Sequence, residues 1–340
     1  MTVNYSSLRL IWLALIGLAF FVSCSHAPQQ VAVSGETMGT TYHIRYVSAN
    51  PRHDAEKVKE RVDGLLAQIN SQMSTYDPDS ELSTFNAKQT TEPVVISRSL
   101  EHVVRRALEI AEETDGLLDV TVGPLVNLWS FGPEQRPEVI PSAAQLAAAR
   151  DVTGYQHLSV ENHQLQKDIA GLYVDLSTIA KGYAVDRVGR LLEQMEIQNY
   201  LVEIGGEMLM KGSKPGNQPW RIAIERPDST QRAAQRIIEP GNNAVATSGD
   251  YRNFFEQDGV RYSHIIDPRT GKPIQHNLVS VTVVTESCMD ADAYATALTV
   301  MGPEDALAFA EAKQLAVMLI TRENGEFKEY TSTAFKPFLQ

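Results

Sequence analysis

Cysteine and positive charge are both scarce in this sequence. Its 340 residues include two cysteines, Cys24 and Cys288, which excludes a framework of several disulfides and a zinc site built from several cysteines. Lys and Arg number 30 against 42 Asp and Glu, giving a net charge of −12. Nonspecific nucleic-acid binding needs a basic surface, so this balance argues against nucleic acid as a partner and against electrostatic docking on anionic lipid. We expect Cys288 to be a buried structural thiol.

Long hydrophobic runs are also missing, apart from one near the N-terminus. Residues 10–22 are apolar and follow Arg9. A membrane-spanning helix needs ~20 apolar residues, so this shorter run predicts the core of a secretory signal peptide. The run ends just before Cys24, in a segment that resembles the cleavage site of bacterial lipoproteins; a plain secretory signal with an incidental cysteine is the alternative. We therefore predict a signal peptide at 1–23, a lipid on Cys24 and a tether at 24–34.

The remainder of the chain is long enough to bury a sizeable core, and its patterns mix helix with strand. Alternating or clustered apolar residues predict strands at 40–48, 172–176, 199–204, 220–225, 279–285, 315–321 and 326–333. Apolar residues at helical spacing predict helices at 54–70, 99–114, 141–150, 181–196, 290–301 and 303–313. Asn324-Gly325, between the last two strands, is a hairpin signal. The mixture predicts an α+β fold without a composition break that would divide it.

Two stretches place residues that could bind a ligand at the start of a predicted strand or a predicted helix. GETMGTTY at 35–42 has glycines and hydroxyl residues at a strand entrance, where the backbone can approach a ligand; an ordinary turn is the alternative. VDLSTIAKGYA at 174–184 enters a predicted helix, whose free N–H groups suit a phosphate, and Lys181 adds positive charge. This stretch lacks the glycine spacing of a Walker A loop. A plain connection with Ser177 or Thr178 as the helix cap is an equal alternative.

Two further stretches lie in the last third of the chain. His264 precedes the turn signal Asp-Pro-Arg-Thr-Gly at 267–271, although a lone histidine is more often structural than catalytic. Asp292 and Thr296 fall on one face of a predicted helix. A carboxylate and a hydroxyl are hard oxygen ligands of the kind that Mg²⁺ prefers. The alternative is acidic charge that stabilises the helix N-terminus, with Thr296 packed inside.

Taken in order, these stretches resemble the ApbE family, the FAD:protein FMN transferases. The resemblance spans residues 31–335 and rests on ETMGTTY, STYDPDSELSTFN, TDGLLDVTVGPLVNLWSFG, VDLSTIAKGYAVD, LVEIGGEM, SHIIDPRTGKPI and ADAYATAL. It implies an α+β fold related to the T-fold, formed by residues 35–335, with FAD in the cleft between two lobes. It also implies Mg²⁺-dependent transfer of the FMN part of FAD to a threonine or serine hydroxyl of a target protein, with release of AMP.

The resemblance also assigns roles position by position. It implies contacts with the flavin or the rest of FAD for Met38, Tyr76, Leu117, Leu118, Asp119, Ser177, Tyr183, His264 and Ile265, and an Mg²⁺ site made by Asp292, Thr296 and the carbonyl of Ala180. Some family members carry glutamate in place of Lys181, so Lys181 receives no firm role. The implied targets are subunits of sodium-pumping NADH:quinone reductase and related electron-transfer complexes. The implied location is the periplasm, with a lipid anchor for which we favour the inner membrane.

The implied chemistry suits these residue types. Mg²⁺ neutralises and aligns the charged pyrophosphate, which an acidic protein would otherwise repel. The acceptor hydroxyl must lose a proton as it attacks phosphorus, and His264 is our first candidate for the base because a neutral imidazole is available near pH 7. Asp292 is the second predicted catalytic residue, because it would bind the Mg²⁺. Three alternatives remain open: an FAD pyrophosphatase that uses water as the nucleophile, a lipoprotein that only binds FAD, and a generic solute-binding lipoprotein.

Overall fold

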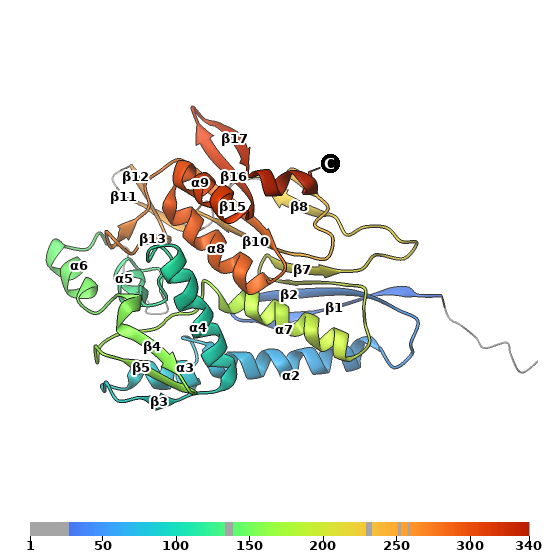
Figure 1. The fold of residues 1–340 in the computed structure, drawn as a ribbon, viewed down its shortest axis with the longest axis horizontal. Coiled ribbons are helices and arrows are strands. Elements are labelled where there is room, and N and C mark those ends of the chain that lie inside the picture. The colour runs from blue at the N-terminus through green and yellow to red at the C-terminus, as the bar shows by residue number, and fades with distance from the viewer. Residues whose placement is uncertain (1–26, 133–138, 229–232, 251–252, 258, 340) are drawn as a thin grey trace, which may run out of the picture.

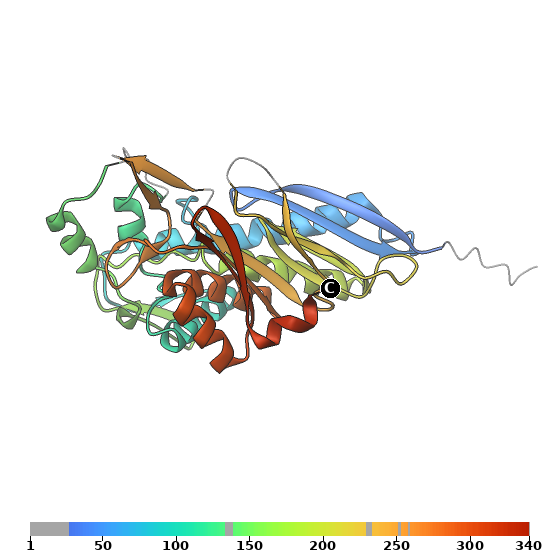
Figure 2. The ribbon, with the colours of Figure 1, turned by 90° about the horizontal axis from the view of Figure 1, so that it is seen from above.

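Helices cover one face of a large antiparallel sheet (Figure 1). In Figure 2 the blue strands β1 and β2 lie along one edge of this sheet. The computed structural model describes residues 27–132, 139–228, 233–250, 253–257 and 259–339. The strands of the sheet, in spatial order, are β1 (Gln29–Thr37), β2 (Thr40–Ser48), β6 (Tyr200–Ile204), β7 (Glu207–Lys211), β10 (Ala244–Gly249), β15 (Leu278–Thr285), β16 (Ala316–Glu323) and β17 (Glu326–Thr331).

The main core fills the space between the sheet and its helices. These helices are α2 (Ala55–Met73), α4 (Arg98–Glu113), α7 (Ala180–Gln194), α8 (Cys288–Met301) and α9 (Pro303–Lys313). Alternate strand residues such as Tyr42 and Ile44 of β2 point into this core and are buried, whereas Thr41 and His43 point away from it and are exposed. This alternation is the period of two that the strand predictions used.

A second, smaller core lies on the opposite face of the sheet. There the hairpin of β8 (Ile222–Glu225) and β9 (Ala234–Ile238) and the short helix η2 (Thr333–Phe338) cover part of that face. Ile222 and Ile224 of β8 are buried among Val245 of β10 and Phe335 of η2. The two faces of the sheet are therefore covered differently, by several helices on one side and by a hairpin with one short helix on the other.

The remaining elements are short and gather at the left of the view in Figure 1. They are α3 (Glu81–Ala87), α5 (Gly123–Leu128), α6 (Ala143–Arg150), η1 (Tyr155–His157), β3 (Val94–Val95), β4 (Leu158–Glu161), β5 (Gln164–Lys167), β11 (Phe254–Gln257), β12 (Val260–Ser263), β13 (Ile266–Asp267) and β14 (Lys272–Pro273). The turn between β13 and β14 contains the Asp-Pro-Arg-Thr-Gly signal, and Gly271 N–H donates to the carbonyl of Asp267 there at 2.8 Å.

Most of the predicted helices and strands are confirmed, with ends that shift by a few residues. Between β16 and β17, Asn324 and Gly325 have φ of 52° and 86°, which is the conformation that an Asn-Gly hairpin turn needs. Cys288 is fully buried and free, as predicted, and burial raises the pKa of its thiol.

The strand predicted at 172–176 is wrong. Among the described residues this segment belongs to no strand, although Leu172, Val174 and Leu176 are buried in alternation. Its main-chain groups pair elsewhere: the side chain of Asn86 donates to the carbonyl of Val174 and accepts from its N–H, each at 2.8 Å. A side-chain amide thus takes the place of a strand partner, which the alternation pattern cannot reveal.

The predicted tether is too long, because β1 begins at Gln29. Val31 and Val33 face the core, and the whole of β1 pairs with β2. The predicted signal peptide at 1–23 and the lipid on Cys24 lie outside the described residues. Within the described ranges, no helix has the length and apolar content needed to cross a membrane.

Candidate active site

A cavity of about 430 Å³ opens where the short elements meet the end of the main sheet. Most of the residues singled out from the sequence line it. They are Tyr76, Leu117, Leu118, Asp119, Ser177, His264, Ile265, Asp292 and Thr296. The fold therefore brings together segments that are more than two hundred positions apart in the sequence.

Three of the predicted residues are not among the described residues that line this cavity. Met38 lies in the β1–β2 turn with φ of 51° and packs against the main core. Ala180 is buried at the first position of α7. Tyr183 is also buried, its hydroxyl accepts a hydrogen bond from Arg187 Nη1 at 2.6 Å, and it lines a separate cavity. Their roles in binding FAD or Mg²⁺ stay predictions.

The floor of the cavity holds two buried carboxylates and one ammonium group. Lys181 Nζ lies 3.1 Å from Glu207 Oε1 and 3.5 Å from Asp292 Oδ2. Asp292 Oδ2 also accepts the N–H of Gly182 at 3.1 Å. Gly182 allows this approach because α7 and α8 nearly touch there: a Cβ on Gly182 would lie 2.2 Å from the carbonyl oxygen of Cys288. The absence of a side chain at 182 thus sets the position of Lys181 beside Asp292.

Charge on this floor is unbalanced toward the negative. Burial raises the pKa of Glu207 to about 7, Lys181 opposes that rise, and Asp292 adds to it. Burial by itself would lower the pKa of Lys181, but Asp292 and Glu207 outweigh it and hold that pKa above its usual value. Glu207 Oε2 is buried with no hydrogen-bond partner among the described residues. An unpartnered carboxylate oxygen beside a second carboxylate favours a cation as the missing partner.

The donors available there are hard oxygens, which fit Mg²⁺. Thr296 follows Asp292 by one helical turn, and its hydroxyl donates to the Asp292 carbonyl at 3.2 Å. In the described ranges, no cluster of three or more His, Cys, Asp or Glu side chains is arranged to hold a metal. A cation on this floor would therefore need main-chain, hydroxyl or phosphate oxygens as well, which is how Mg²⁺ is commonly held beside a nucleotide.

His264 lies on the wall of the cavity, between β12 and β13. Its Nδ1 is 2.9 Å from the carbonyl oxygen of Asn253. A carbonyl can only accept, so Nδ1 carries the proton and Nε2 of the neutral ring keeps a free lone pair. Burial lowers the pKa of His264, the hydrogen bond to Asn253 partly opposes this, and the charge of Lys181 lowers it further. The imidazole is therefore held neutral, with one nitrogen able to take a proton.

Asp119 has a different role from the carboxylates on the floor. Its Oδ1 accepts from the N–H and the hydroxyl of Thr121, each at 2.7 Å, and its Oδ2 accepts from the N–H of Tyr155 at 3.1 Å. Both oxygens are thus occupied within the protein. Burial raises the pKa of Asp119 against these bonds. This side chain fixes the shape of the 117–119 segment that lines the cavity.

The α7 helix begins beside the cavity, and its first N–H groups are partly occupied: the N–H of Gly182 donates to Asp292 Oδ2 at 3.1 Å, and the N–H of Ala180 donates to the carbonyl of Leu176 at 2.8 Å. Its N-cap residue is Ile179, and neither Ser177 nor Thr178 caps it among the described contacts, so that alternative from the sequence is wrong. The hydroxyl oxygen of Thr178 is buried without a partner in the described structure. The N-terminus of α7 carries partial positive charge, which suits a phosphate group and is already partly used by the carboxylate of Asp292.

Glu207 is the functional candidate that sequence reasoning missed. It follows the Gly205-Gly206 turn in the quoted segment LVEIGGEM, and it is the first residue of β7. An acidic residue directly after two glycines was the only signal in the sequence, and its burial beside Lys181 became visible only in the structure.

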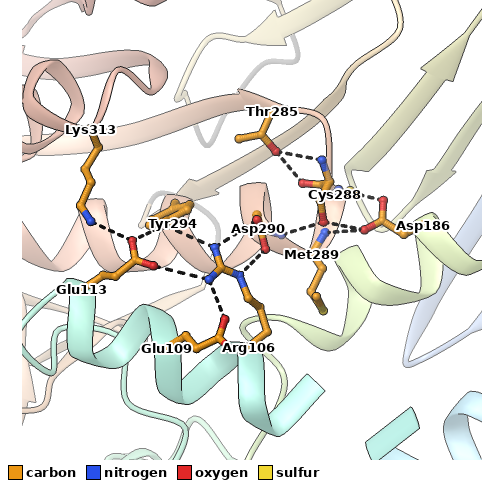
Figure 3. A network of polar contacts seen from close by, with 11 residues as sticks. Arg106, Glu109, Glu113, Asp186, Thr285, Cys288, Met289, Asp290, Tyr294 and Lys313 are labelled. Carbon is orange, nitrogen blue, oxygen red and sulfur yellow. Dashed lines mark hydrogen bonds and ion pairs between the residues drawn. The ribbon is translucent and has the colours of Figure 1, made fainter. Parts of the chain in front are cut away.

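A second polar network lies behind the cavity and fixes α8 (Figure 3). Asp186 of α7 accepts from the N–H groups of Cys288 and Met289, at 2.8 and 3.1 Å, and thereby caps α8. Arg106 of α4 binds Asp290 of α8 through two nitrogens, at 2.8 and 3.1 Å. Because these contacts come from two different helices, they hold the first turn of α8, and with it the position of Asp292.

The sequence is similar to a family of known enzymes. The sequence model of the ApbE family matches residues 38–319. A Vibrio cholerae O1 protein named FAD:protein FMN transferase is 54% identical over 329 residues, which cover 96% of this chain and 98% of that protein. The Escherichia coli K12 protein of the same name is 43% identical over 351 residues, which cover 100% and 99%.

The fold is similar to solved structures of such enzymes. The flavin transferase ApbE from Vibrio cholerae matches with a TM-score of 0.86 at 54% identity, covering 92% of this chain and all of that one. The apo form of the Pseudomonas stutzeri flavinyl transferase ApbE matches with a TM-score of 0.86 at 41% identity, covering 92% and 98%. These matches confirm the α+β architecture predicted from the sequence.

Proposed function

This chain belongs to the ApbE family, and on that premise we propose that it transfers the FMN part of FAD to a target protein. The observation that carries the proposal is one cavity that combines oxygen donors, the N-terminus of α7 and a neutral histidine. These are the parts that phosphoryl transfer from a dinucleotide requires, since the reaction needs charge neutralisation, alignment and removal of one proton.

Mg²⁺ would be held by Asp292, Thr296 and the carbonyl of Ala180. The net negative charge of the floor and the unpartnered oxygen of Glu207 support this proposal. When bound, the metal supplies charge neutralisation for the pyrophosphate. Lys181 bridges Asp292 and Glu207, because its ammonium group forms an ion pair with each carboxylate.

His264 removes the proton in this proposal. The acceptor hydroxyl oxygen forms a bond to the phosphorus on the FMN side of FAD, the bond from that phosphorus to the AMP oxygen breaks, and AMP leaves. The hydroxyl proton passes to Nε2 of His264, whose orientation is fixed by the Nδ1 hydrogen bond to Asn253. A positioned base of this kind contributes roughly 10²–10⁴-fold.

The acceptor we propose is a threonine or serine of a subunit of sodium-pumping NADH:quinone reductase or a related complex. The test is intact-mass spectrometry of that purified subunit after incubation with this protein, FAD and Mg²⁺. A mass gain of one FMN supports the transferase. Formation of FMN and AMP with an unmodified subunit would instead identify an FAD pyrophosphatase.

We further propose that the protein acts in the periplasm from a lipid anchor on Cys24. The apolar run at 10–22 and its position before Cys24 support this. Replacing Cys24→Ser should move the protein from the membrane fraction to the soluble periplasmic fraction, as judged by immunoblotting after osmotic lysis. A wild-type protein that is already soluble without detergent would contradict the anchor.

A further inference from the structure

A second, larger hollow adjoins the candidate active site. It measures about 600 Å³ and lies between the face of the main sheet that carries Thr41 and His43 and the β8–β9 hairpin. It shares two lining residues, Gly205 and Thr247, with the active-site cavity. The two hollows therefore meet at the β6–β7 turn, which contains Gly205. We call the second hollow the side groove.

One wall of the side groove is the open edge of a strand. All of β8, from Ile222 to Glu225, lines it, and among the described strands β8 pairs with β9 alone. Arg226 N–H donates to the carbonyl of Ala233, on the β9 side, at 2.8 Å. Main-chain groups alternate in direction along a strand, so those of Ala223 point to the other side, toward the groove. The groove thus offers the main-chain groups of Ala223, which pair with no other strand among the described residues.

The floor of the groove combines polar and apolar side chains. Thr41 and His43 come from the outward positions of β2, Glu203 from β6, and Met208 and Val245 from β7 and β10. His43 is exposed. This mixture, beside an open strand edge, is the surface that extended polypeptide segments bind, with main-chain hydrogen bonds for affinity and side-chain contacts for selection.

The passage from the groove to the active site is lined by small residues. Gly205 and Gly206 have φ of 62° and 106°, and a Cβ on Gly206 would meet no atom within 4 Å. In the described structure β10 pairs with β7 only at Ala244 and Val245, so the edge of β10 at Thr247 is open on that side. A chain could therefore pass over Gly206 without meeting a neighbouring side chain, whereas at Gly205 it would pass beside the side chains of Thr40 and Glu207.

We propose that the side groove binds the acceptor segment of the target protein. The segment is extended, pairs with β8 at Ala223, and carries its threonine or serine hydroxyl over Gly205 and past Thr247 into the active site. Small residues should flank that hydroxyl, because the passage is shaped by glycines. This inference rests on the proposed function, since it assigns the docking site of the protein substrate for the same reaction.

Steady-state transfer with two matched tryptophan variants tests the proposal. His43→Trp fills the groove, whereas Arg45→Trp adds the same bulk to the same strand and face at an exposed position outside the groove lining. With the quinone-reductase subunit as acceptor, His43→Trp should lower kcat/KM for the acceptor at least tenfold, mainly through KM. FAD affinity, measured by flavin fluorescence, should stay within twofold. Arg45→Trp should leave both quantities within twofold of the wild type.

A backbone variant tests the strand pairing itself. Ala223→Pro removes an N–H that points away from β9, so the hairpin should persist while the hydrogen bond to an added strand is lost. We expect about a fivefold fall in acceptor kcat/KM. Hydrogen exchange provides a second measurement: in the wild type, the Ala223 amide should exchange at least tenfold more slowly when the acceptor subunit is present.

Specific outcomes would overturn the proposal. These are unchanged acceptor kinetics in His43→Trp, an equal loss of FAD affinity in that variant, which would make the groove part of the FAD site, or Ala223 protection that depends on enzyme concentration alone, which would indicate a second copy of this chain. If the wild-type protein leaves the subunit unmodified, the proposed function fails separately. Hydrogen exchange still decides whether the subunit occupies the groove, and an unprotected Ala223 then overturns this inference too.

Discussion

The interface of α7 with α8 and the neighbouring strand β7 holds carboxylates of two kinds. Asp186 accepts hydrogen bonds from the Ser287 hydroxyl and from the N–H groups of Cys288 and Met289, so its charge is satisfied within the protein. At the start of α7, Lys181 forms ion pairs with both Glu207 and Asp292, and one oxygen of Glu207 has no partner among the described residues. The same residue types are therefore structural where their hydrogen bonds are complete and available for chemistry where they are not.

The largest effect should follow from removing a carboxylate beside Lys181, where the hydrogen bonds of the carboxylates are incomplete. Asp292→Ala should lower FMN transfer more than about a hundredfold, because the site loses its charged oxygen ligand. Chelation of the wild type with EDTA should reproduce the loss, and Mg²⁺ should restore it. The metal should also raise the melting temperature of the wild type but not of the variant, as followed by differential scanning fluorimetry. Full transfer in EDTA would contradict this part of the comparison.

The next largest effect concerns the base. His264→Ala should lower single-turnover transfer at saturating FAD by ~10²-fold with FAD affinity little changed. Only the neutral imidazole accepts a proton, and its pKa is lowered below the ordinary value of 6.5. The wild-type rate should therefore be flat near pH 8 and fall on acidification with a midpoint below 6.5. A variant that keeps both the rate and the pH dependence would remove His264 from the mechanism.

A substitution at Asp186, whose hydrogen bonds are complete, should instead lower the stability of the protein. Asp186→Asn keeps the size of the side chain but offers fewer acceptor sites to the three donors of α8. We expect a loss of about 1–3 kcal/mol in the free energy of unfolding, measured by urea denaturation. Transfer per folded molecule should fall less than about threefold. A collapse of activity at unchanged stability would erase the distinction between the two ends of the interface.

A further effect sharpens the comparison through pH. The pKa of Glu207 is raised by burial to about 7, from 4.5 in the unfolded chain, so folding favours its protonated form. Its stabilising contribution is complete below pH 4.5 and is lost as the pH rises through about 7. Without metal, the wild type should therefore lose up to about 2–3 kcal/mol between pH 5 and 8 relative to Glu207→Gln. Parallel stability curves for the two proteins would show that Glu207 titrates normally.

Local patterns predicted the elements well where one face is buried and the turn chemistry is explicit. The helix α4 and the Asn324-Gly325 hairpin are examples. The same patterns misassigned 172–176, because the side chain of Asn86, far away in the sequence, replaces a strand partner. They also gave no sign of the ion pair between Lys181 and Glu207, since that contact depends on how α7 docks against β7.

Most of the predicted site residues rest on the family resemblance rather than on residue spacing and side-chain chemistry. Spacing alone could place Asp292 and Thr296 on one helical face, and it left the metal and capping interpretations equal. The orientation of His264 depends on the carbonyl of Asn253, whose approach no sequence pattern encodes. Folding supplies this hydrogen bond, which fixes the ring of His264, and the role of His264 as the base is a proposal tested by the His264→Ala variant.

The close contact between Gly182 and the carbonyl of Cys288 fixes the distance between α7 and α8 at the candidate active site. Because Gly182 has no side chain, α7 can approach α8 closely. This approach sets the distance between Lys181 of α7 and Asp292 of α8. Alanine at 182 would widen the gap between α7 and α8 and move Lys181 relative to Asp292. A variant that keeps the present distance between α7 and α8 can therefore carry no side chain at position 182.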